Sequence, residues 1–400
     1  IYQSFEDVSE SEVGSNKALE YLTSIVERRY AAWLTTLREA DLVVFQAEGS
    51  MGMGEDFAKG PRLMVLPFVA KHAWNRTVIA MNQSFYSQNP IVRRNAAITF
   101  KSLDFCAFRE SLSLAFAREN GVKNACLIPD LAFMARSWDT DIKPREKPPT
   151  CFAITGSALK DPRRYEVVIE QTKRIAKNTG LSPVVAVSRD YQLTLASYLQ
   201  LGKLGTTRIP RSANYVDVTK QFSENAFLIG GRYHMAILAA AALTPSILFQ
   251  GNSFKNEGVS HLLGDVRSVR GFSDNDTIMN DIDVILNNFG NETNALSHHV
   301  TAIRNTIRRA QMHLREAILG GGTFAFDDQL PVFQRPIEGI LEQYKQYGAG
   351  KRKKRSGLRL MVNELSEKMS ADDDNKAAKR VVASCIKSGD REFEPVQKQL

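Results

Sequence analysis

The chain has 400 residues, of which 43% are hydrophobic and 24% are charged, and its formal net charge is +8 at pH 7. These fractions are those of an ordinary globular protein, and the length favours two domains over one. No run approaches the ~20 apolar residues that span a bilayer, and the start does not resemble a signal peptide. Because the chain begins at Ile1 rather than methionine, we expect that residues preceding it are missing.

Short apolar runs alternate with helical segments in the first part of the chain. Residues 1–18 are acidic and serine-rich, which is typical of a poorly ordered lead-in. The first domain is expected to cover residues 19–137. Its strands are predicted at residues 41–46, 77–81, 105–108 and 125–128, and its helices at 16–39, 62–72, 90–101 and up to about 120. Such alternation predicts a parallel sheet.

A second alternation follows a proline-containing linker at residues 138–150. We expect the second domain at residues 151–325 and a basic, helical extension at 326–400. Strands are predicted at 152–155, 184–187, 226–229 and 246–249, helices at 163–178, 190–201, 235–243 and 298–319, and a polar loop at 250–258. Three glycines after residue 319 would stop the last helix. The fold class expected is therefore α/β, with two Rossmann-like domains.

Cysteines and local charge give weaker signals. None of the four cysteines sits in a C-x-x-C pair, so buried thiols are expected rather than a zinc site or a disulfide framework; they are Cys106, Cys126, Cys151 and Cys385. The basic block of residues 351–355 can meet an acidic membrane surface or nucleic acid, or form a solvated turn. Nucleic-acid binding is not expected, because aromatic residues are not interleaved with the basic ones.

The strongest signal for function is the segment Gly230-Gly231-Arg232-Tyr233-His234. It lies between an apolar run and an alanine-rich helix former, which reads as strand, glycine turn and helix. Ligands of α/β sheets bind at the carboxyl ends of the strands. Arginine donates two parallel hydrogen bonds to carboxylate or phosphate, and a helix N-terminus also favours anions. A small anionic ligand is therefore expected here, although an isolated Arg-x-His could equally be structural.

Other polar residues are ambiguous when taken singly. Arg109 follows a predicted strand of the first domain, and we expect Lys255 to belong to the second sheet beside Arg232 and His234. The glycine-rich loop at residues 47–54 could cradle phosphate, but it lacks both common phosphate-loop patterns and fits a tight strand-to-helix turn. The remaining histidines are expected to be structural; they are His72, His261, His298, His299 and His313.

Taken together, the motif around Arg232, the alanine-rich helix, Thr244-Pro245, the next apolar strand and residues 252–258 resemble the signature of the polysaccharide pyruvyl transferase family. The resemblance extends back through residues 41–50, 108–111 and 129–133, and covers roughly residues 20–320. It implies two facing Rossmann-like domains, similar to the glycosyltransferase-B fold. It also implies transfer of the enolpyruvyl group of phosphoenolpyruvate onto two hydroxyls of a sugar in a polysaccharide or glycan precursor, giving a pyruvate ketal and phosphate.

The resemblance gives each candidate residue an expected role. Arg109 and Arg232 would clamp the two anionic groups of phosphoenolpyruvate from opposite domains, and His234 would be the general acid. Further donor-binding candidates are Gly231, Asn252, Ser253 and Lys255, and candidates for the acceptor site or its base are Glu48, Gly49, Ser50 and Asp56. No cofactor and no metal are expected.

The first domain departs from the family pattern. The family's first strand and its glycine-rich start are absent, which suggests truncation, and Gln46-Ala47-Glu48 replace glycines in the next loop. The alternatives are therefore a glycosyltransferase using a nucleotide sugar and an inactive binding protein of the same fold. The expected acceptor is polymeric or lipid-linked. The expected location is the cytoplasm, with peripheral contact to the inner membrane through residues 351–355, or the Golgi lumen if an anchor has been removed.

Overall fold

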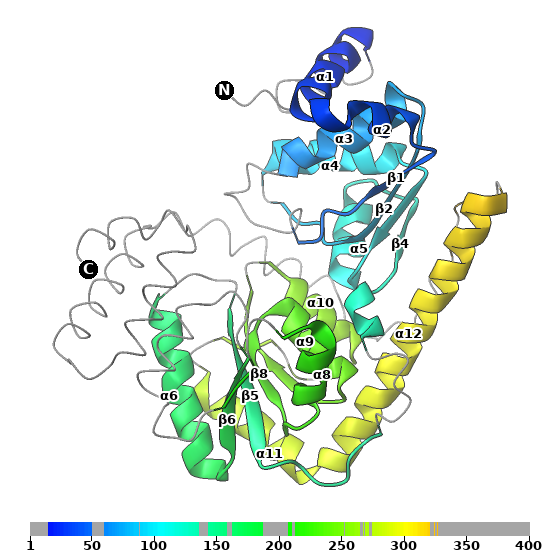
Figure 1. The fold of residues 1–400 in the computed structure, drawn as a ribbon. Helices are drawn as coiled ribbons and strands as arrows, with labels where there is room; N and C mark the ends of the chain where they lie inside the picture. The colour runs from blue at the N-terminus through cyan, green and yellow to red at the C-terminus, as the bar shows by residue number, and fades with distance from the viewer. Residues whose placement is uncertain are drawn as a thin grey trace. The chain divides into compact units, whose positions relative to one another are not determined.

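The computed structural model describes residues 15–49, 60–87, 89–135, 143–157, 162–186, 207–209, 213–251, 253–264, 267, 269–271, 274–320, 324 and 326 (Figure 1). The predicted helix at 190–201, the basic block at 351–355 and almost all of the lead-in and the C-terminal extension lie outside these residues. The chain divides into two compact units. The first unit contains Ile1–Phe133, Asn252–Asp265 and His299–Gly350, and the second contains Met134–Gly251, Val266–His298 and Lys351–Leu400.

The first unit is built around a four-stranded parallel sheet with the strand order β1-β2-β3-β4. Each of these strands was predicted from the sequence, as were the helices between them. The elements are α1 (Asn16–Arg29), α2 (Leu34–Glu39), β1 (Leu42–Phe45), α3 (Gly60–His72), β2 (Thr77–Gln83), α4 (Pro90–Ser102), β3 (Phe105–Phe108), α5 (Ser111–Glu119) and β4 (Ala125–Leu127), followed later in the chain by α10 (Lys255–Leu262).

Packing decides where the first helix of this unit ends. The predicted helix at 16–39 is interrupted at Tyr30, and a short 3-10 turn (Ala31–Trp33) separates α1 from α2. Helix α1 buries Leu22 and Val26 against α3, whereas neither the 3-10 turn nor α2 buries a residue. Most helical stability in proteins comes from a packed face, so the chain leaves the helix where that face ends.

The second unit is built around a five-stranded parallel sheet in the order β7-β6-β5-β8-β9. Its elements are β5 (Cys151–Ser157), α6 (Pro162–Thr179), β6 (Ser182–Ala186), β7 (Thr207–Ile209), α8 (Tyr215–Phe222), β8 (Leu228–Gly231), α9 (Tyr233–Ala241), β9 (Ser246–Leu248), α11 (Asn275–Asn287) and α12 (Phe289–Gly320), the last of which continues into the first unit. The prediction missed β7, α8 and α11, and it began the last helix nine residues late. The α/β fold class with parallel sheets is confirmed.

Alternating side chains of this sheet enter two separate cores. Phe152, Ile154 and Ile229 pack with apolar residues of α6 and α11. Ala153 and Leu228, which are directly adjacent in sequence to these residues, pack instead with residues of α8 and α9. Successive side chains of a strand point to opposite faces. The sheet is therefore covered on both faces, which explains why its strands read as continuous apolar runs.

Arg145 anchors residues 143–150, the described part of the predicted linker, to the second unit. Its guanidinium donates to the backbone oxygens of Ser223, Asn225 and Leu243, the last two at 3.4 Å. The guanidinium carbon also lies 5.2 Å from the ring centre of Phe289. Burial lowers the pKa of Arg145. Residues 143–150 are thus part of the second unit rather than a free tether.

Two further sequence expectations can be compared with the structure. Cys106 and Cys126 are buried thiols and Cys151 is half-buried, all three without a disulfide, while Cys385 lies outside the described residues. Among the described helices, none combines the length and apolarity needed to cross a bilayer.

The predicted polar loop at 250–258 is wrong in its second half, where helix α10 begins at Lys255. Tertiary packing explains the difference, because it fixes the start of this helix. Phe254, just before the helix, is fully buried, and the centre of its ring lies 4.8 Å from that of Tyr86 and 6.4 Å from that of Phe116. Helix α10 packs on α5 and belongs to the first unit. The sequence analysis had placed this segment with the second sheet.

Candidate functional site

The loops after the four strands of the first unit are joined to one another. The amide of Ser84 donates to the carbonyl of Glu48 at 2.8 Å, which joins the loops after β2 and β1. The amide of Arg109 donates to the carbonyl of Gln83 at 3.0 Å, and that of Leu131 donates to Asn82 Oδ1 at 3.1 Å. Parallel strands end at one edge of a sheet, so this edge gathers polar groups from all four loops.

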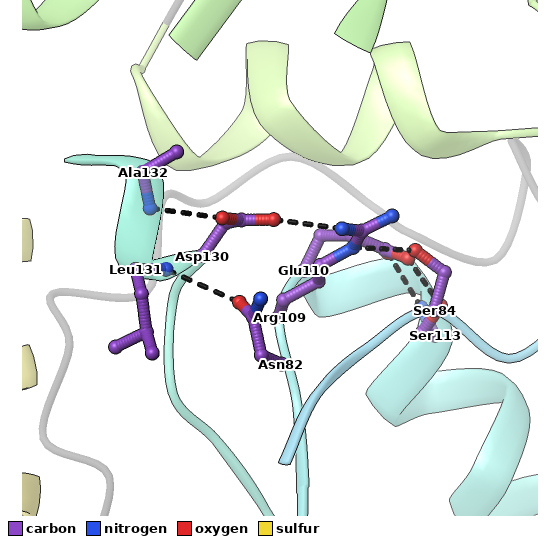
Figure 2. Close-up of polar contacts among 8 residues, drawn as sticks. All are labelled: Asn82, Ser84, Arg109, Glu110, Ser113, Asp130, Leu131 and Ala132. Atoms are coloured by element: carbon purple, nitrogen blue, oxygen red, sulfur yellow. Dashed lines mark hydrogen bonds and ion pairs between the residues drawn. The ribbon is translucent and has the colours of Figure 1, made fainter. Parts of the chain in front are cut away.

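A buried arginine lies in the middle of this edge (Figure 2). Arg109 is only 1% exposed; its Nη1 donates to Asp130 Oδ2 at 2.8 Å and its Nε donates to Ser84 Oγ at 3.0 Å. Asp130 also accepts from the amide of Ala132. We call Asn82, Ser84, Arg109, Glu110 and Asp130 the strand-end cluster. A buried ion pair of this kind is costly to break, by about 3–5 kcal/mol, so it fixes the geometry of the edge.

Glu110 is the third buried charged side chain of the cluster, after Arg109 and Asp130. It caps the N-terminus of α5, where one carboxylate oxygen accepts from the amide of Ser113 at 2.8 Å and the other accepts from the Ser113 hydroxyl. Burial raises the pKa of Glu110, while the Ser113 hydrogen bonds and the charge of Arg109 oppose that shift. Its role is therefore structural, since it satisfies the free amides at a helix start.

Helix α10 closes over this buried carboxylate. A β-carbon on Gly258 would lie 2.8 Å from Glu110 Oε2 and 2.9 Å from Glu110 Cβ, so only glycine permits the approach. At the other end of the helix, Ser111 Oγ lies 3.0 Å from His261 Nδ1, and both residues are buried. His261 therefore has a structural contact, as the sequence analysis expected.

Two cationic groups converge beside Gly49, in the loop after β1. A β-carbon built on Gly49 would lie 3.0 Å from Lys255 Nζ and 3.4 Å from Arg109 Nη2. Ser253, which precedes α10, is fully buried, and its hydroxyl has no hydrogen-bond partner among the described residues. The first unit alone thus brings together three of the predicted site residues, Gly49, Arg109 and Lys255, and Lys255 belongs to helix α10, which was not predicted from the sequence.

The second unit holds the glycine-rich motif at the centre of its sheet. Strand β8 lies beside β5, and the order of strands reverses at this pair, which is the usual ligand position in an open α/β sheet. A β-carbon on Gly230 would lie 2.1 Å from Thr155 Oγ1 and 2.7 Å from the Thr155 carbonyl oxygen. Gly230 is therefore required for the close approach of the two strands.

Arg232 and His234 follow directly from this pair of strands. Arg232 is the N-cap residue of α9, makes no side-chain capping bond there, and is half-buried. His234 lies in the first turn and is exposed, with its ring centre 5.3 Å from that of the buried Tyr233. The N-terminus of α9, with its amides and helix dipole, favours an anion. A cation, amides and an imidazole at one strand end can bind an anion and donate a proton.

The predicted site residues therefore separate into two sets. Gly49, Arg109, Ser253 and Lys255 belong to the first unit, with the exposed Glu48 next to Gly49, whereas Gly231, Arg232 and His234 belong to the second. Ser50, Asp56 and Asn252 lie outside the described residues. The partners of Arg109 were not predicted from the sequence. The available signal was that polar residues follow every predicted strand, Ser84 and Asp130 among them, but their pairing cannot be read from a pattern.

Comparison with known proteins identifies a family for this chain. A family model described as polysaccharide pyruvyl transferase matches residues 3–253. Among curated proteins, none matches this sequence.

Solved structures resemble the chain only distantly. UDP-GlcNAc 2-epimerase of Methanocaldococcus jannaschii, in complex with UDP-GlcNAc and UDP, shares 12% identity over 69% of this chain and 76% of its own, with a TM-score of 0.47. UDP-GlcNAc 2-epimerase of Neisseria meningitidis, bound to UDP-GlcNAc, shares 10% identity over 76% of this chain and 84% of its own, with a TM-score of 0.45.

Proposed function

Because the chain belongs to the polysaccharide pyruvyl transferase family, and is therefore a transferase, we propose that it moves the enolpyruvyl group of phosphoenolpyruvate onto two hydroxyls of one sugar. The product is a cyclic pyruvate ketal, and phosphate is released. The acceptor is a sugar of a polysaccharide or of a lipid-linked precursor. As proposed, the reaction uses no cofactor.

The observation that carries this proposal is the position of Arg232 and His234 at the start of α9, after the central strand β8. Phosphoenolpyruvate carries a carboxylate and a phosphate close together, and arginine with helix amides suits either group. The exposed imidazole of His234, in the first turn of α9, can exchange protons with a bound ligand. We assign Arg232 to an anionic group of the donor and His234 to proton donation.

The proposed reaction balances as follows. A proton from the imidazolium of His234 adds to the methylene carbon, and a cation develops at the central carbon. The first sugar hydroxyl forms a bond to that carbon and gives its proton to a base of the acceptor site. The second hydroxyl forms a bond as the carbon–oxygen bond to phosphate breaks, and its proton leaves with the phosphate. General acid catalysis of this kind contributes roughly 10²–10⁴-fold.

We propose that Arg109 orders the first unit rather than binding an anionic group of phosphoenolpyruvate through two parallel hydrogen bonds. Two of its nitrogens already donate to Asp130 and Ser84, and its Nη2 lies at the cationic point beside Gly49. Two of the five N–H donors of the guanidinium are therefore engaged within the first unit. Arg109 instead orders the strand-end loops of the first unit and contributes charge there.

The test is to incubate the protein with phosphoenolpyruvate and galactoside, glucoside or mannosamine acceptors, and to measure phosphate release and the ketal. Arg232→Ala and His234→Ala should each lower turnover by about 10²-fold or more. Arg232→Lys keeps the charge and should recover only part of it, because lysine lacks the planar fork.

His298→Ala is the matched control, since His298 is an exposed histidine of the second unit away from the start of α9. It should leave turnover unchanged. Unchanged turnover in Arg232→Ala or His234→Ala would refute the roles. Thermal stabilisation by a nucleoside diphosphate, but not by phosphoenolpyruvate, would refute the donor and favour a nucleotide-sugar glycosyltransferase.

A further inference from the structure

Glu48 has a backbone conformation that its side chain does not favour. Its φ angle is +48°, in the left-handed region where the β-carbon crowds the following carbonyl. Glycine or asparagine normally serves at such positions. Glu48 lies directly after β1, at the carboxyl edge of the sheet, so a strained residue coincides with the place where α/β proteins bind ligands.

The surrounding structure imposes this conformation. The carbonyl of Glu48 accepts the amide of Ser84 at 2.8 Å, and the preceding Ala47 is only 4% exposed. The hydrogen bond from Ser84 and the burial of Ala47 both hold the backbone in place, while the Glu48 side chain remains exposed. The carboxylate is thus presented outward from a fixed position, at a cost in stability.

The neighbouring groups indicate what this carboxylate meets. Gly49, the next residue, faces Lys255 Nζ and Arg109 Nη2, so the loop that carries Glu48 lies against two cationic groups of the first unit. The other carboxylates of this edge are already engaged, because Asp130 pairs with Arg109 and Glu110 caps α5, and both are buried. Among the described residues of the strand-end loops, Glu48 is the exposed carboxylate.

We infer that Glu48 is the general base for the acceptor, a role that rests on the proposed function. Its carboxylate takes the proton of the first sugar hydroxyl as the hydroxyl oxygen forms its bond to the central carbon of the donor. The resulting carboxylic acid returns the proton to solvent after the ketal closes. The acceptor diol therefore lies against the loop after β1.

The test separates the carboxylate from the backbone strain. Glu48→Gln keeps the shape and should lower kcat by about 10²–10⁴-fold with little change in the KM for phosphoenolpyruvate. Glu48→Gly should lower kcat equally but raise Tm by about 2–4 °C, because glycine relieves the left-handed strain. Added formate should restore part of the turnover of Glu48→Gly, since it can occupy the vacated space and accept the proton.

Asn75→Gly is the matched control, because Asn75 has a φ of +51°, is exposed, and lies in the turn before β2 rather than after a strand. It should leave kcat unchanged and alter Tm in the same direction or not at all. Full turnover in Glu48→Gln, with wild type forming ketal, would overturn the inference while leaving the proposed function intact. Lack of formate rescue together with a lowered Tm in Glu48→Gly would also overturn it, by showing a structural role. Absence of ketal with wild type would instead count against the proposed function.

Discussion

Replacing Gly230 with alanine should test how the motif-bearing strand is fixed in the second unit. The added methyl would lie 2.1 Å from Thr155 Oγ1, 2.7 Å from the Thr155 carbonyl oxygen and 3.1 Å from its carbonyl carbon. Optimal separation between carbon atoms is about 3.5–4.0 Å. The register between β5 and β8 shifts between Ile154 and Ser157, and two of the three contacts are to backbone atoms of Thr155, so rotation of a side chain cannot relieve the clash.

The expected cost follows from these contacts. Overpacking in a core typically costs about 1–3 kcal/mol, and more where backbone must move. Replacing glycine recovers about 0.4–1 kcal/mol by restricting the unfolded chain. A net loss of ~1–2.5 kcal/mol would lower Tm by roughly 2–10 °C for a unit of this size. The same displacement would shift Arg232, two residues on, and lower turnover.

The assay is thermal and urea unfolding with two further variants. Gly320→Ala makes the same chemical change at a position where a β-carbon meets nothing within 4 Å, and should be close to neutral. Thr155→Ala in the Gly230→Ala background removes the hydroxyl contact but not the carbonyl contact, and should recover only part of the loss. Full recovery, or a Gly230→Ala protein as stable as wild type, would refute the argument that backbone contact dictates glycine here.

Three other predictions concern stability. Gly258→Ala should lower stability by about 1–2 kcal/mol despite the better helix propensity of alanine, because the added methyl group would clash with Glu110. Limited proteolysis within α10 should therefore increase. An unchanged rate of cleavage would contradict this predicted clash. Arg145→Ala should lower the free energy of unfolding by about 2–3 kcal/mol, because the charged hydrogen bonds of Arg145 are lost. Arg174→Ala, which removes a surface ion pair, should lower it by less than about 0.5 kcal/mol. Equal unfolding midpoints for the two variants would contradict the stabilising role of Arg145. Burial raises the pKa of Glu110, so wild-type stability should fall as pH rises above the ordinary value of about 4.3 through the raised value, and Glu110→Gln should remove that slope.

Much of the fold could be predicted because its strands are short apolar runs followed by polar residues. All four strands of the first sheet, and four of the five in the second, were predicted within a few residues of their observed bounds. The exceptions share a cause. Strand β7 has three residues, and α8 and α11 are amphipathic segments whose apolar faces become evident only against the sheet they cover.

The candidate site divides in the same way. Gly230 to His234 could be found from sequence because strand, glycine turn and helix are consecutive in the chain. The pairing of Arg109 with Asp130 spans 21 residues, and the approach of Lys255 to Gly49 spans about 200. No local pattern encodes such contacts, and the sequence analysis accordingly assigned Lys255 to the second sheet.

The sequence by itself therefore determined the α/β class, the motif after β8 and the family, because local periodicity and consecutive residues carry them. Only the tertiary structure decided that α10 belongs to the first unit, that Arg109 is buried in an ion pair, and that Glu48 is held with a positive φ. Each of these depends on burial of Phe254 and on hydrogen bonds between loops that meet only when parallel strands align at one edge.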